Sequence, residues 1–460
     1  MSEFLPGVRM DGELPSRSSI PVIFDELDYQ LACQAYLWAL PLVSYAQWKS
    51  QHYGIFGATG SDLVRYLSYR DRIGLITANA TTPYILNFFD LSETGPLVIE
   101  LPAGPTAGGV SDFWQREVGV MGEMGPDRGR GGKYLVLAPG DDAPDGAGES
   151  YRLLRSTGVN IMFGFRTLDP DPGTSDALAR AVRIYPYRDR ENPAPTRIIS
   201  PDGRPWNGDQ PRGLEYWRML HGIYQTETVD ERDRFYLAML RQLGIRKGEP
   251  FAPDERLTGI LERGAAAGEL MAQANTFAKR FEQGTYWPDR VWEQAIVLDN
   301  SAQRGNGYDE LLERASWFYE AVSFSEAMKS TTPGAGQAYL GSYTDADGNW
   351  LDGGSSYTLR VPAEVPAKLF WSATVYDAQT RYLIDNAQQR GDRGSRDSDL
   401  RLNGDGSVDL FFGPDVPQGG ESNWVQTIPG RKWFSYFRLY GPLEPYFDRT
   451  WKLGDIELQR

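Results

Sequence analysis

Two long blocks of the sequence consist of short apolar runs separated by Gly and Pro. The first block contains "TPYILNFFDL", "GPLVIELPAG", "GKYLVLAPG" and "VNIMFGFRTL", and the second contains "SYTLRVPAEVP", "LFWSATVYDA", "VDLFFGP" and "KWFSYFRLYGP". Short apolar runs bounded by turn residues are typical of β-strands. The 50 Gly and 30 Pro residues also favour many turns over long helices. The pattern predicts a β-sandwich over residues 75–190 and a second, jelly-roll-like sandwich from Gln337 onward.

Helical periodicity marks two other regions. Residues 25–50 carry apolar side chains at helical spacing, and Pro41 is expected to kink or end that helix. A Pro/Gly-rich connector at 193–212 precedes a mainly helical stretch, 213–330. We therefore predict an α+β, β-rich chain in which a helical segment joins two antiparallel β-sandwich modules. The expected parts are an arm (1–24), a first domain (25–192), a connector with helices (193–334) and a second domain (335–460).

Composition excludes several classes of function. A net charge of −15 argues against nucleic acid and anionic membranes as partners. No stretch approaches the roughly 20 apolar residues of a membrane span. The N-terminus has no apolar signal-peptide core, so a cytoplasmic location is expected, although a trimmed mature form would look the same. The sequence has no dinucleotide fingerprint, haem motif or cysteine cluster, so no cofactor is expected.

Metal sites also find little support. Cys33 is the only cysteine, which excludes an internal disulfide, and with two histidines a zinc site built on several imidazoles is excluded. "YTDADGNWLDGG" and "LRLNGDGSVDLFFGP" carry acidic and amide side chains that could ligate calcium. Both stretches lack the later Glu of an EF-hand, and an Asp-Gly pair between strands is a strong hairpin signal. We predict turns and no metal site.

Candidate acid–base residues come from three motifs. In "SDFWQRE", a strand would put Asp112, Trp114 and Arg116 on one face, which suits a ligand wall or, equally, an internal Asp–Arg ion pair. Glu117 ends that motif. His221 lies in a helical pattern, where an ordinary structural histidine is the more common case. "FWSATVYDAQTRYLID" and "GGESNWVQTIPG" are rich in aromatic and polar side chains that could line a pocket or anchor loops. The predicted catalytic residues are Asp112, Glu117, His221 and Asp377.

The predicted ligand-binding residues are polar and aromatic side chains from the same motifs and from "ANATTPY". In "ANATTPY", Asn79, Thr81 and Thr82 could equally serve as local backbone caps. Arg381 would offer a planar fork to a carboxylate, phosphate or carbonyl, or would pair with a nearby Asp to hold its loop. The full set is Asn79, Tyr84, Trp114, Tyr376, Arg381 and Trp424.

Several of these motifs resemble a bacterial protein family that pairs the domains of unknown function twelve-fifty-four and twelve-fourteen. The N-terminal resemblance rests on "TANATTPYILNFFDLSETGPLVIELP" and "GPDRGRGGKYLVLAPG", and the C-terminal one on "NGDGSVDLFFGPDVP", "ESNWVQTIPG" and "FRLYGPLEPYFD". The resemblance implies two β-sandwich modules joined by helices. Members commonly read Asn-x-Asp-Thr-x-Tyr where this chain has Asn79, Thr81, Thr82 and Tyr84, so one candidate acid or base is missing. Many relatives also look exported.

Two functions are compatible with these features. The first is an enzyme of hydrolase or lyase type that acts on a small organic molecule in a cleft between the sandwiches, without a redox cofactor. The alternative is a binding protein for a carbohydrate or another small ligand. A homo-oligomer whose aromatic residues only fill interfaces is a third, structural possibility. A shifted carboxyl group in an enclosed cleft would favour the enzyme.

Overall fold

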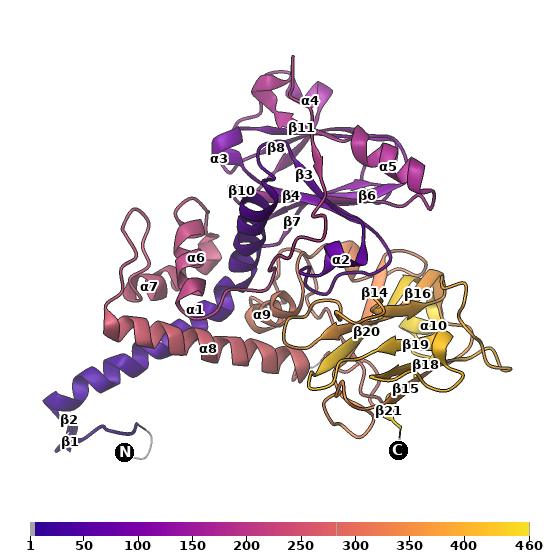
Figure 1. Cartoon of the computed structure of the whole chain (residues 1–460). Coiled ribbons are helices and arrows are strands. Elements are labelled where there is room, and N and C mark those ends of the chain that lie inside the picture. The colour runs from indigo at the N-terminus through magenta and orange to yellow at the C-terminus, as the bar shows by residue number, and fades with distance from the viewer. Residues whose placement is uncertain (1–4, 282, 460) are drawn as a thin grey trace.

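The computed structural model describes residues 5–281 and 283–459. Figure 1 shows a first sandwich at the top, a group of helices at the left and a second sandwich at the lower right. The predicted class, two sandwich modules joined by helices, is confirmed, although each module also contains parallel strand pairs. None of the helices within the described ranges is long and apolar enough to cross a lipid bilayer.

The first sandwich packs a six-stranded sheet on a four-stranded one. The larger sheet has the order β12 (Ile198–Ile199), β3 (Leu63–Tyr66), β4 (Tyr84–Asp90), β10 (Asn160–Thr167), β6 (Thr106–Asp112) and β7 (Glu117–Gly122). The smaller sheet has the order β11 (Arg183–Pro186), β5 (Leu97–Leu101), β8 (Gly132–Leu137) and β9 (Arg152–Arg155). Apolar side chains of both sheets fill the core between them, among them Phe89, Ile99, Val136 and Phe163. Four short helices lie on its loops: α2 (Tyr69–Arg72), α3 (Leu91–Thr94), α4 (Ala147–Ser150) and α5 (Pro172–Ala181).

The second sandwich repeats this arrangement with five and four strands. Its larger sheet has the order β13 (Glu293–Gln294), β14 (Gln337–Ser342), β20 (Trp433–Pro442), β16 (Ala367–Asp377) and β17 (Asp392–Gly394). Its smaller sheet has the order β19 (Trp424–Gln426), β18 (Val408–Gly413), β15 (Tyr357–Val361) and β21 (Ile456–Leu458), and α10 (Glu444–Phe447) follows β20. The core also contains Tyr286, Trp287 and Trp292. The module therefore recruits residues from the segment predicted to be helical.

The helical part combines α1 (Ile20–Gln51) with α6 (Leu214–Tyr224), α7 (Arg234–Gln242), α8 (Glu255–Phe277) and α9 (Leu311–Glu320). The helix α1 packs against all four. Two glycines of α8 allow a close crossing, since an added Cβ would lie 2.5 Å from the Ala32 Cβ at Gly264 and 2.6 Å from the Tyr36 ring at Gly268. Pro41 does not end α1, which continues to Gln51, and Figure 1 shows the helix changing direction along its length. Ahead of α1, β1 (Met10–Asp11) pairs with β2 (Leu14–Pro15).

One core cluster connects all three parts. It contains Trp38 of α1, Trp317 of α9, Phe88 of the first sandwich and Tyr376 and Phe434 of the second. Burial of large side chains from each part against the others makes independent domain motion unfavourable. The sandwiches are therefore held at a fixed separation by the helices.

Both Asp-Gly stretches form tight turns. In the first, the Gly348 N–H donates to the Asp345 carbonyl over 3.0 Å, and the Asp345 carboxylate accepts the Asp347 and Asn349 N–H groups. In the second, the Gly406 N–H donates to the Asn403 carbonyl over 2.9 Å. Gly348 and Gly406 have φ angles of +83° and +81°, which suit glycine. Within the described ranges, no three His, Cys, Asp or Glu side chains gather in a way that could hold a metal ion.

A buried histidine contributes to the junction between α1 and the first sandwich. His52 is fully buried, its Nε2 lies 2.7 Å from the Tyr66 hydroxyl, and its Nδ1 lies 3.1 Å from Asn87 Oδ1. The Asn87 amide nitrogen donates to the carbonyls of Ala58 and Asp62, which leaves Asn87 Oδ1 as an acceptor. His52 therefore carries its proton on Nδ1 and accepts from Tyr66, and burial lowers its pKa to about 3.

This lowered pKa predicts a loss of stability in acid. The unfolded His52 takes up a proton below about pH 6.5, whereas the folded one stays neutral until far lower pH, so stability falls as the pH falls through that window. Between about pH 7 and pH 5, we expect roughly 2 kcal/mol less unfolding free energy from this group alone. His52→Gln should flatten the pH dependence of urea unfolding by that amount. An unchanged slope in the variant would contradict the assignment.

Candidate functional site

A cavity of about 620 Å³ lies between the two sandwiches. Its first wall is the six-stranded sheet, with side chains from β4, β6, β7 and β10, and its second wall is the five-stranded sheet, with side chains from β14, β16 and β20. The segments 75–82 and 321–328 close its sides. Exposed lining residues, Met124, Leu369 and Arg396, mark the mouth. The cavity exists because sheets of different modules face each other there.

Strand β20 supplies the second wall through its alternation. Tyr436, Arg438 and Tyr440 line the cavity, while Phe437 and Leu439 point into the core of the second sandwich. Successive side chains of a strand point to opposite faces, so the run "YFRLY" contributes to the cavity wall and to the core of the second sandwich. Tyr339 of β14 adds a further hydroxyl to the same wall.

The side chains of the first wall alternate between core and cavity in the same way, and several of its cavity-lining positions are glycines. On β10, Met162, Gly164 and Arg166 face the cavity. Gly109 of β6 and Gly119 of β7 also line it. Without side chains at these positions, the backbone of the sheet itself forms part of the floor, which leaves room for a ligand.

Arg438 is buried among tyrosines. Its Nη1 donates to Thr374 Oγ1 and its Nη2 to the Thr77 carbonyl, both over 3.0 Å. The guanidinium lies 5.2 Å from the ring centre of Tyr436 and 5.3 Å from that of Tyr339. Cation–π contacts of this kind stabilise a positive charge without neutralising it.

Arg166 faces Arg438 across the same tyrosines. Its guanidinium lies 4.2 Å above the Tyr84 ring, and Nη1 donates to Thr82 Oγ1 over 3.1 Å. It is enclosed by protein yet keeps part of its surface open, because it lines the cavity. Tyr84, Tyr339 and Tyr440 act electrostatically on both guanidinium groups.

No carboxylate of a described residue forms an ion pair with Arg166 or Arg438. The half-buried carboxyl group of Asp392 interacts electrostatically with Arg438, and desolvation raises the pKa of Asp392 to about 6. Buried charges are normally paired or hydrogen-bonded throughout, since an uncompensated charge is costly in a low dielectric. The cavity therefore carries a positive potential that an anion would neutralise.

The "ANATTPY" motif shapes the edge of the cavity. Asn79 Oδ1 accepts the backbone and side-chain donors of Thr81 and the Thr82 N–H, and Asn79 Nδ2 donates to the Tyr440 hydroxyl. The Tyr84 hydroxyl accepts the Asn79 N–H over 2.7 Å. The capping role expected for this motif is thus present, and the same bonds orient two cavity tyrosines. Burial raises the pKa of Tyr440 above its usual range, so its hydroxyl stays protonated.

Glu117, at the start of β7, is the acidic group within the cavity wall. Its Oε2 is buried and has no hydrogen-bond partner among the described residues. Burial and, less strongly, the nearby charge of Glu326 raise the pKa of Glu117. Glu123 also lines the cavity but is exposed. A carboxyl with a raised pKa that faces a ligand space can give or accept a proton.

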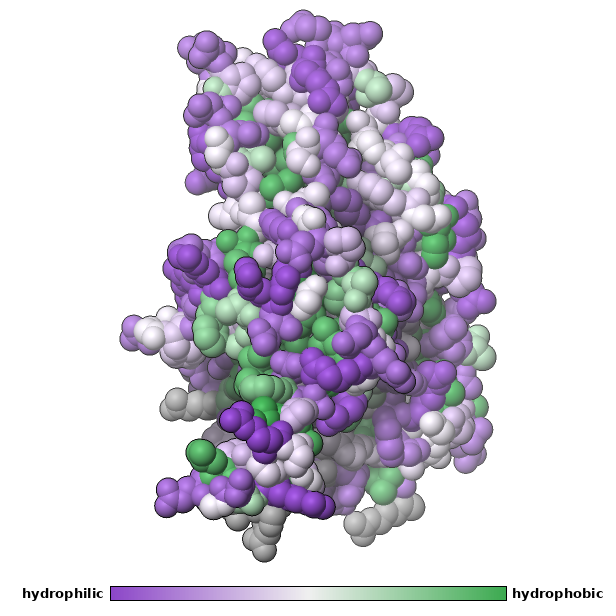
Figure 2. All heavy atoms as spheres, turned by 90° about the vertical axis from the view of Figure 1, so that its left-hand side faces the viewer, coloured by the Kyte–Doolittle hydropathy of each residue, from purple (hydrophilic) through white to green (hydrophobic). Residues whose placement is uncertain are grey.

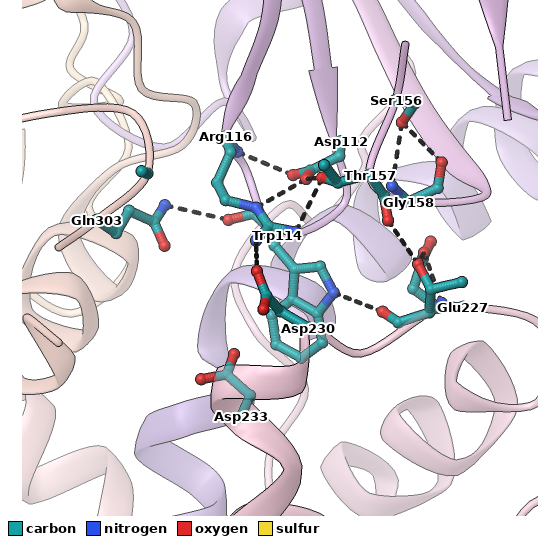
Figure 3. A network of polar contacts seen from close by, with 12 residues as sticks. Asp112, Trp114, Arg116, Ser156, Thr157, Gly158, Glu227, Asp230, Asp233 and Gln303 are labelled. Atoms are coloured by element: carbon teal, nitrogen blue, oxygen red, sulfur yellow. Dashed lines mark hydrogen bonds and ion pairs between the residues drawn. The ribbon is translucent and has the colours of Figure 1, made fainter. Parts of the chain in front are cut away.

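The structure brings three predicted site residues together, Asn79, Tyr84 and Glu117. Asp112 and Trp114 lie elsewhere, in the polar network of Figure 3, and residues 113–116 form a turn instead of the expected strand face. The Asp112 carboxylate accepts from Arg116 Nε over 2.8 Å and from Thr157 Oγ1 over 2.6 Å. Trp114 donates its indole N–H to the Thr228 carbonyl. Asp112 and Arg116 thus form the internal ion pair, while Trp114 and the second ion pair of Arg116, with Asp230, connect the first sandwich to the loop after α6.

The other predicted residues also lie outside the cavity lining. Tyr376 lies behind it and donates to the Ala78 carbonyl over 2.7 Å. Arg381 is buried and donates to the carbonyls of Tyr319 and Gln379 and to Gln210 Oε1. Asp377 caps its own loop and pairs with Arg431 at 2.9 Å. Tyr376 and Arg381 stabilise the contact between the second sandwich and its neighbours, whereas Asp377 stabilises a loop of that sandwich.

Two further predicted residues contact other surfaces. His221 lies on α6, where Nε2 is 2.9 Å from the Glu249 carbonyl and the ring stacks on Phe251. Trp424 begins β19 and donates to the Gly413 carbonyl, on the smaller sheet of the second sandwich. Neither side chain lines the cavity.

The sequence motifs did not indicate the two cavity arginines, Arg166 and Arg438. Both stand inside strands that look like ordinary core strands, "NIMFGFRT" and "WFSYFRLYGP". An arginine that directly follows a phenylalanine inside an apolar predicted strand was the available signal. A charged side chain there must face a buried polar site or another module, because neither sandwich core accepts it.

The comparisons with known proteins agree with this architecture. Family models match residues 64–186 as a protein of unknown function (DUF1254) and residues 336–444 as a protein of unknown function (DUF1214). The crystal structure of the VPA0106 protein from Vibrio parahaemolyticus aligns with a TM-score of 0.54 and 15% identity, covering 94% of this chain and 100% of that one. An uncharacterized protein from Burkholderia cenocepacia aligns with a TM-score of 0.44 and 13% identity, over 96% and 97% of the two chains. No curated protein matches the chain.

The first cavity wall, with Tyr84 and Arg166, lies within the DUF1254 match, and the second, with Arg438, lies within the DUF1214 match. The order of the two matches is the order expected from the sequence motifs. The chain belongs to the protein family that joins an N-terminal DUF1254 domain to a C-terminal DUF1214 domain.

Proposed function

We propose that this protein binds a small organic anion in the cavity between its two sandwiches. The observation that carries the proposal is the pair of guanidinium groups, Arg166 and Arg438, which face one enclosed space without a carboxylate partner among the described residues. A carboxylate, phosphate or sulfate group would accept hydrogen bonds from a guanidinium fork. Desolvated contacts of this kind are stronger than the same contacts in water.

The remaining lining suits an apolar or aromatic ligand body. Tyr84, Tyr339 and Tyr440 present rings and hydroxyls, while Met162 and Phe370 are apolar. Tyrosine combines a large contact area with one polar group that fixes orientation. A neutral carbohydrate would leave both positive charges uncompensated, so this site supports an anion better than the carbohydrate alternative.

A charge-removing variant tests the anion site. Benzoate is a suitable probe, because it combines one carboxylate with an aromatic ring. Arg166→Gln should weaken benzoate binding by roughly 10- to 150-fold, which corresponds to the loss of one charged hydrogen bond. Isothermal titration calorimetry gives the affinity, and the melting temperature should change little, because Arg166 makes one side-chain hydrogen bond to the described residues.

Arg381→Gln is the matched control. It removes a buried guanidinium of the second module that makes three hydrogen bonds outside the cavity. The control should lower the melting temperature while the folded protein keeps the wild-type affinity for benzoate. Equal affinity losses in both variants would show that binding depends on general stability and would refute the anion site. A wild-type protein that binds neither benzoate nor other small carboxylates would refute it as well.

A second candidate function is acid–base catalysis on the bound anion, of hydrolase or lyase type. It is favoured by Glu117, whose carboxyl lines the cavity with a raised pKa and a buried, unpartnered Oε2. Residues of this kind are concentrated at active sites, although structural sites also contain them. Asp112, His221 and Asp377 have no place in this proposal, because their side chains are engaged elsewhere.

Glu117→Gln separates binding from catalysis. The variant should keep the benzoate affinity, because the positive groups remain, and should lose conversion of any small carboxylate that the wild type turns over. Nuclear magnetic resonance spectra of a carboxylate panel incubated with each protein measure conversion. Glu123→Gln, at the mouth of the same cavity, is the control and should retain it. Conversion by Glu117→Gln at the wild-type rate would exclude this role.

We also propose that the protein forms a homo-oligomer. Exposed large apolar side chains occur on α1, α7 and α8, including Phe24, Leu27, Phe235 and Leu270. Figure 2 shows the face on the helical side of the molecule, where hydrophobic residues lie among hydrophilic ones over its middle and lower parts. The molar mass of the protein in solution tests this proposal, and a monomer would contradict it.

A further inference from the structure

A chain of buried titratable side chains leads away from the cavity wall. Tyr436 of β20 lines the cavity, and the Glu320 carboxyl, at the end of α9, interacts with its hydroxyl. Tyr343 donates to Glu320 Oε1 over 2.5 Å, and Lys279 Nζ donates to the Tyr343 hydroxyl over 2.8 Å. Lys279 Nζ also lies 3.5 Å from Glu293 Oε2. These five residues form a polar chain inside an apolar core, in which the Tyr436–Glu320 and Lys279–Glu293 links are electrostatic contacts and the other links are hydrogen bonds.

The chain has a closed end and an open end. The side chains of Lys279 and Glu320 are fully buried, whereas 16% of the Glu293 side chain is exposed. Glu293 belongs to the edge strand β13, and Tyr436 belongs to β20, with β14 between them. The polar chain therefore runs from β20, at the cavity, past β14 to β13, at the edge of the sheet, where it reaches solvent.

The cavity end contains two polar atoms that lack a hydrogen bond of normal geometry. The Tyr436 hydroxyl and Glu320 Oε2 are both buried and interact with each other only electrostatically, and Lys279 Nζ lies 3.7 Å from Glu320 Oε2. Buried polar atoms are rarely left in this state, so each such atom calls for an explanation. A ligand oxygen in the cavity beside Tyr436 would complete the hydrogen bonds of this end.

The electrostatic surroundings favour proton exchange. Burial raises the pKa of Glu320 and of Glu293, and the positive charge of Lys279 counteracts it in both. Arg438 and Tyr376 are the other charged or titratable groups that act on Tyr436. Two carboxyl groups on one ammonium titrate as a coupled unit, so a change in the charge of one shifts the titration of the other.

We propose that Glu293, Lys279, Tyr343, Glu320 and Tyr436 conduct protons between solvent and the anion cavity. This deepens the proposed function and rests on it. In the inward direction, Tyr343 gives its proton to the Glu320 carboxylate and receives one from the Lys279 ammonium. The Lys279 amine takes a proton from the Glu293 carboxyl, which is reprotonated by water. Tyr436 gives its proton to a ligand oxygen and receives the proton of Glu320. In total, one proton enters from solvent at Glu293 and one proton passes from Tyr436 to the ligand.

Tyr436 is the residue of this chain that touches the ligand space, and the other four act through it. Binding of an anion beside Tyr436 adds negative charge near Glu320, which favours the protonated carboxyl. Anion binding should therefore be accompanied by proton uptake from solvent, with the proton entering at Glu293.

A titration without ligand tests the coupling of the chain. Infrared difference spectra between wild type and Glu320→Gln, recorded across pH, isolate the carboxyl band of Glu320. In a Glu293→Gln background this titration should move to lower pH, because a neighbouring negative charge has been removed. Glu293 is partly exposed and lies at a sheet edge, so the substitution is compatible with folding. If the Glu320 carboxyl band titrates at the same pH in the Glu293→Gln background, the two carboxyl groups are not coupled and the proposal is refuted.

A kinetic measurement tests conduction. Benzoate is mixed with the protein in a stopped-flow instrument, with a pH-indicating dye for protons and tryptophan fluorescence for ligand binding. Glu293→Gln should slow proton uptake by more than about tenfold, which corresponds to an added barrier of about 1.4 kcal/mol, without slowing binding. Tyr436→Phe should abolish the uptake.

Two outcomes would refute conduction along this path. Proton uptake in Glu293→Gln at the wild-type rate would show that protons enter elsewhere, and ligand binding without any proton uptake would show that the chain does not respond. A wild-type protein that gives no fluorescence response to benzoate would count against the proposed function instead, and the infrared titration would still decide whether the chain is coupled.

Discussion

The central strand of the second sandwich, β20, is buried along both faces, and the candidate site depends on this double burial. All ten residues of β20 are buried. One face completes the sandwich core with Phe437 and Leu439, and the other meets the first sandwich with Tyr436, Arg438 and Tyr440. An antiparallel sheet usually exposes one face to water. Here that second face is covered by another module, and a charged residue on it becomes part of an enclosed site.

The helices make this arrangement possible by fixing the distance between the sandwiches. The helix α1 crosses α8 at glycine positions and packs on α9, whose last residue, Glu320, lies beside the cavity wall. Arg381 and the network around Asp112 add hydrogen bonds between modules. These buried polar contacts orient the parts because a displaced partner would leave a charge unpaired. Residues that looked like ligand-binding candidates in the sequence are thus used to hold the walls of the cavity.

The sequence predicted the elements better than their contacts. Short apolar runs, turn residues and helical periodicity are local properties of the sequence, and they identified both sandwiches and the helices between them. The pairing of Arg166 with Arg438 joins residues far apart in the chain, and no local pattern encodes which two sheets face each other. The same limit explains Trp287 and Trp292, which fill the second sandwich although they precede its predicted boundary. Asn79, Tyr84 and Glu117 could be chosen because their motifs combine polar and aromatic residues next to strands.

A cationic cavity within an acidic protein has a consequence for ligand capture. The chain carries a net charge of −15, so an anion approaching from solvent is repelled at long range, and salt weakens that repulsion over a Debye length of about 8 Å. Affinity for the proposed anion would therefore arise at short range, where Arg166 and Arg438 are desolvated. Arg396 at the mouth, which lies 3.7 Å from the Phe370 ring centre, provides a local positive charge on the way in. The neutral tyrosine hydroxyls around the guanidinium groups complete a site that can select for negative charge without attracting it from a distance.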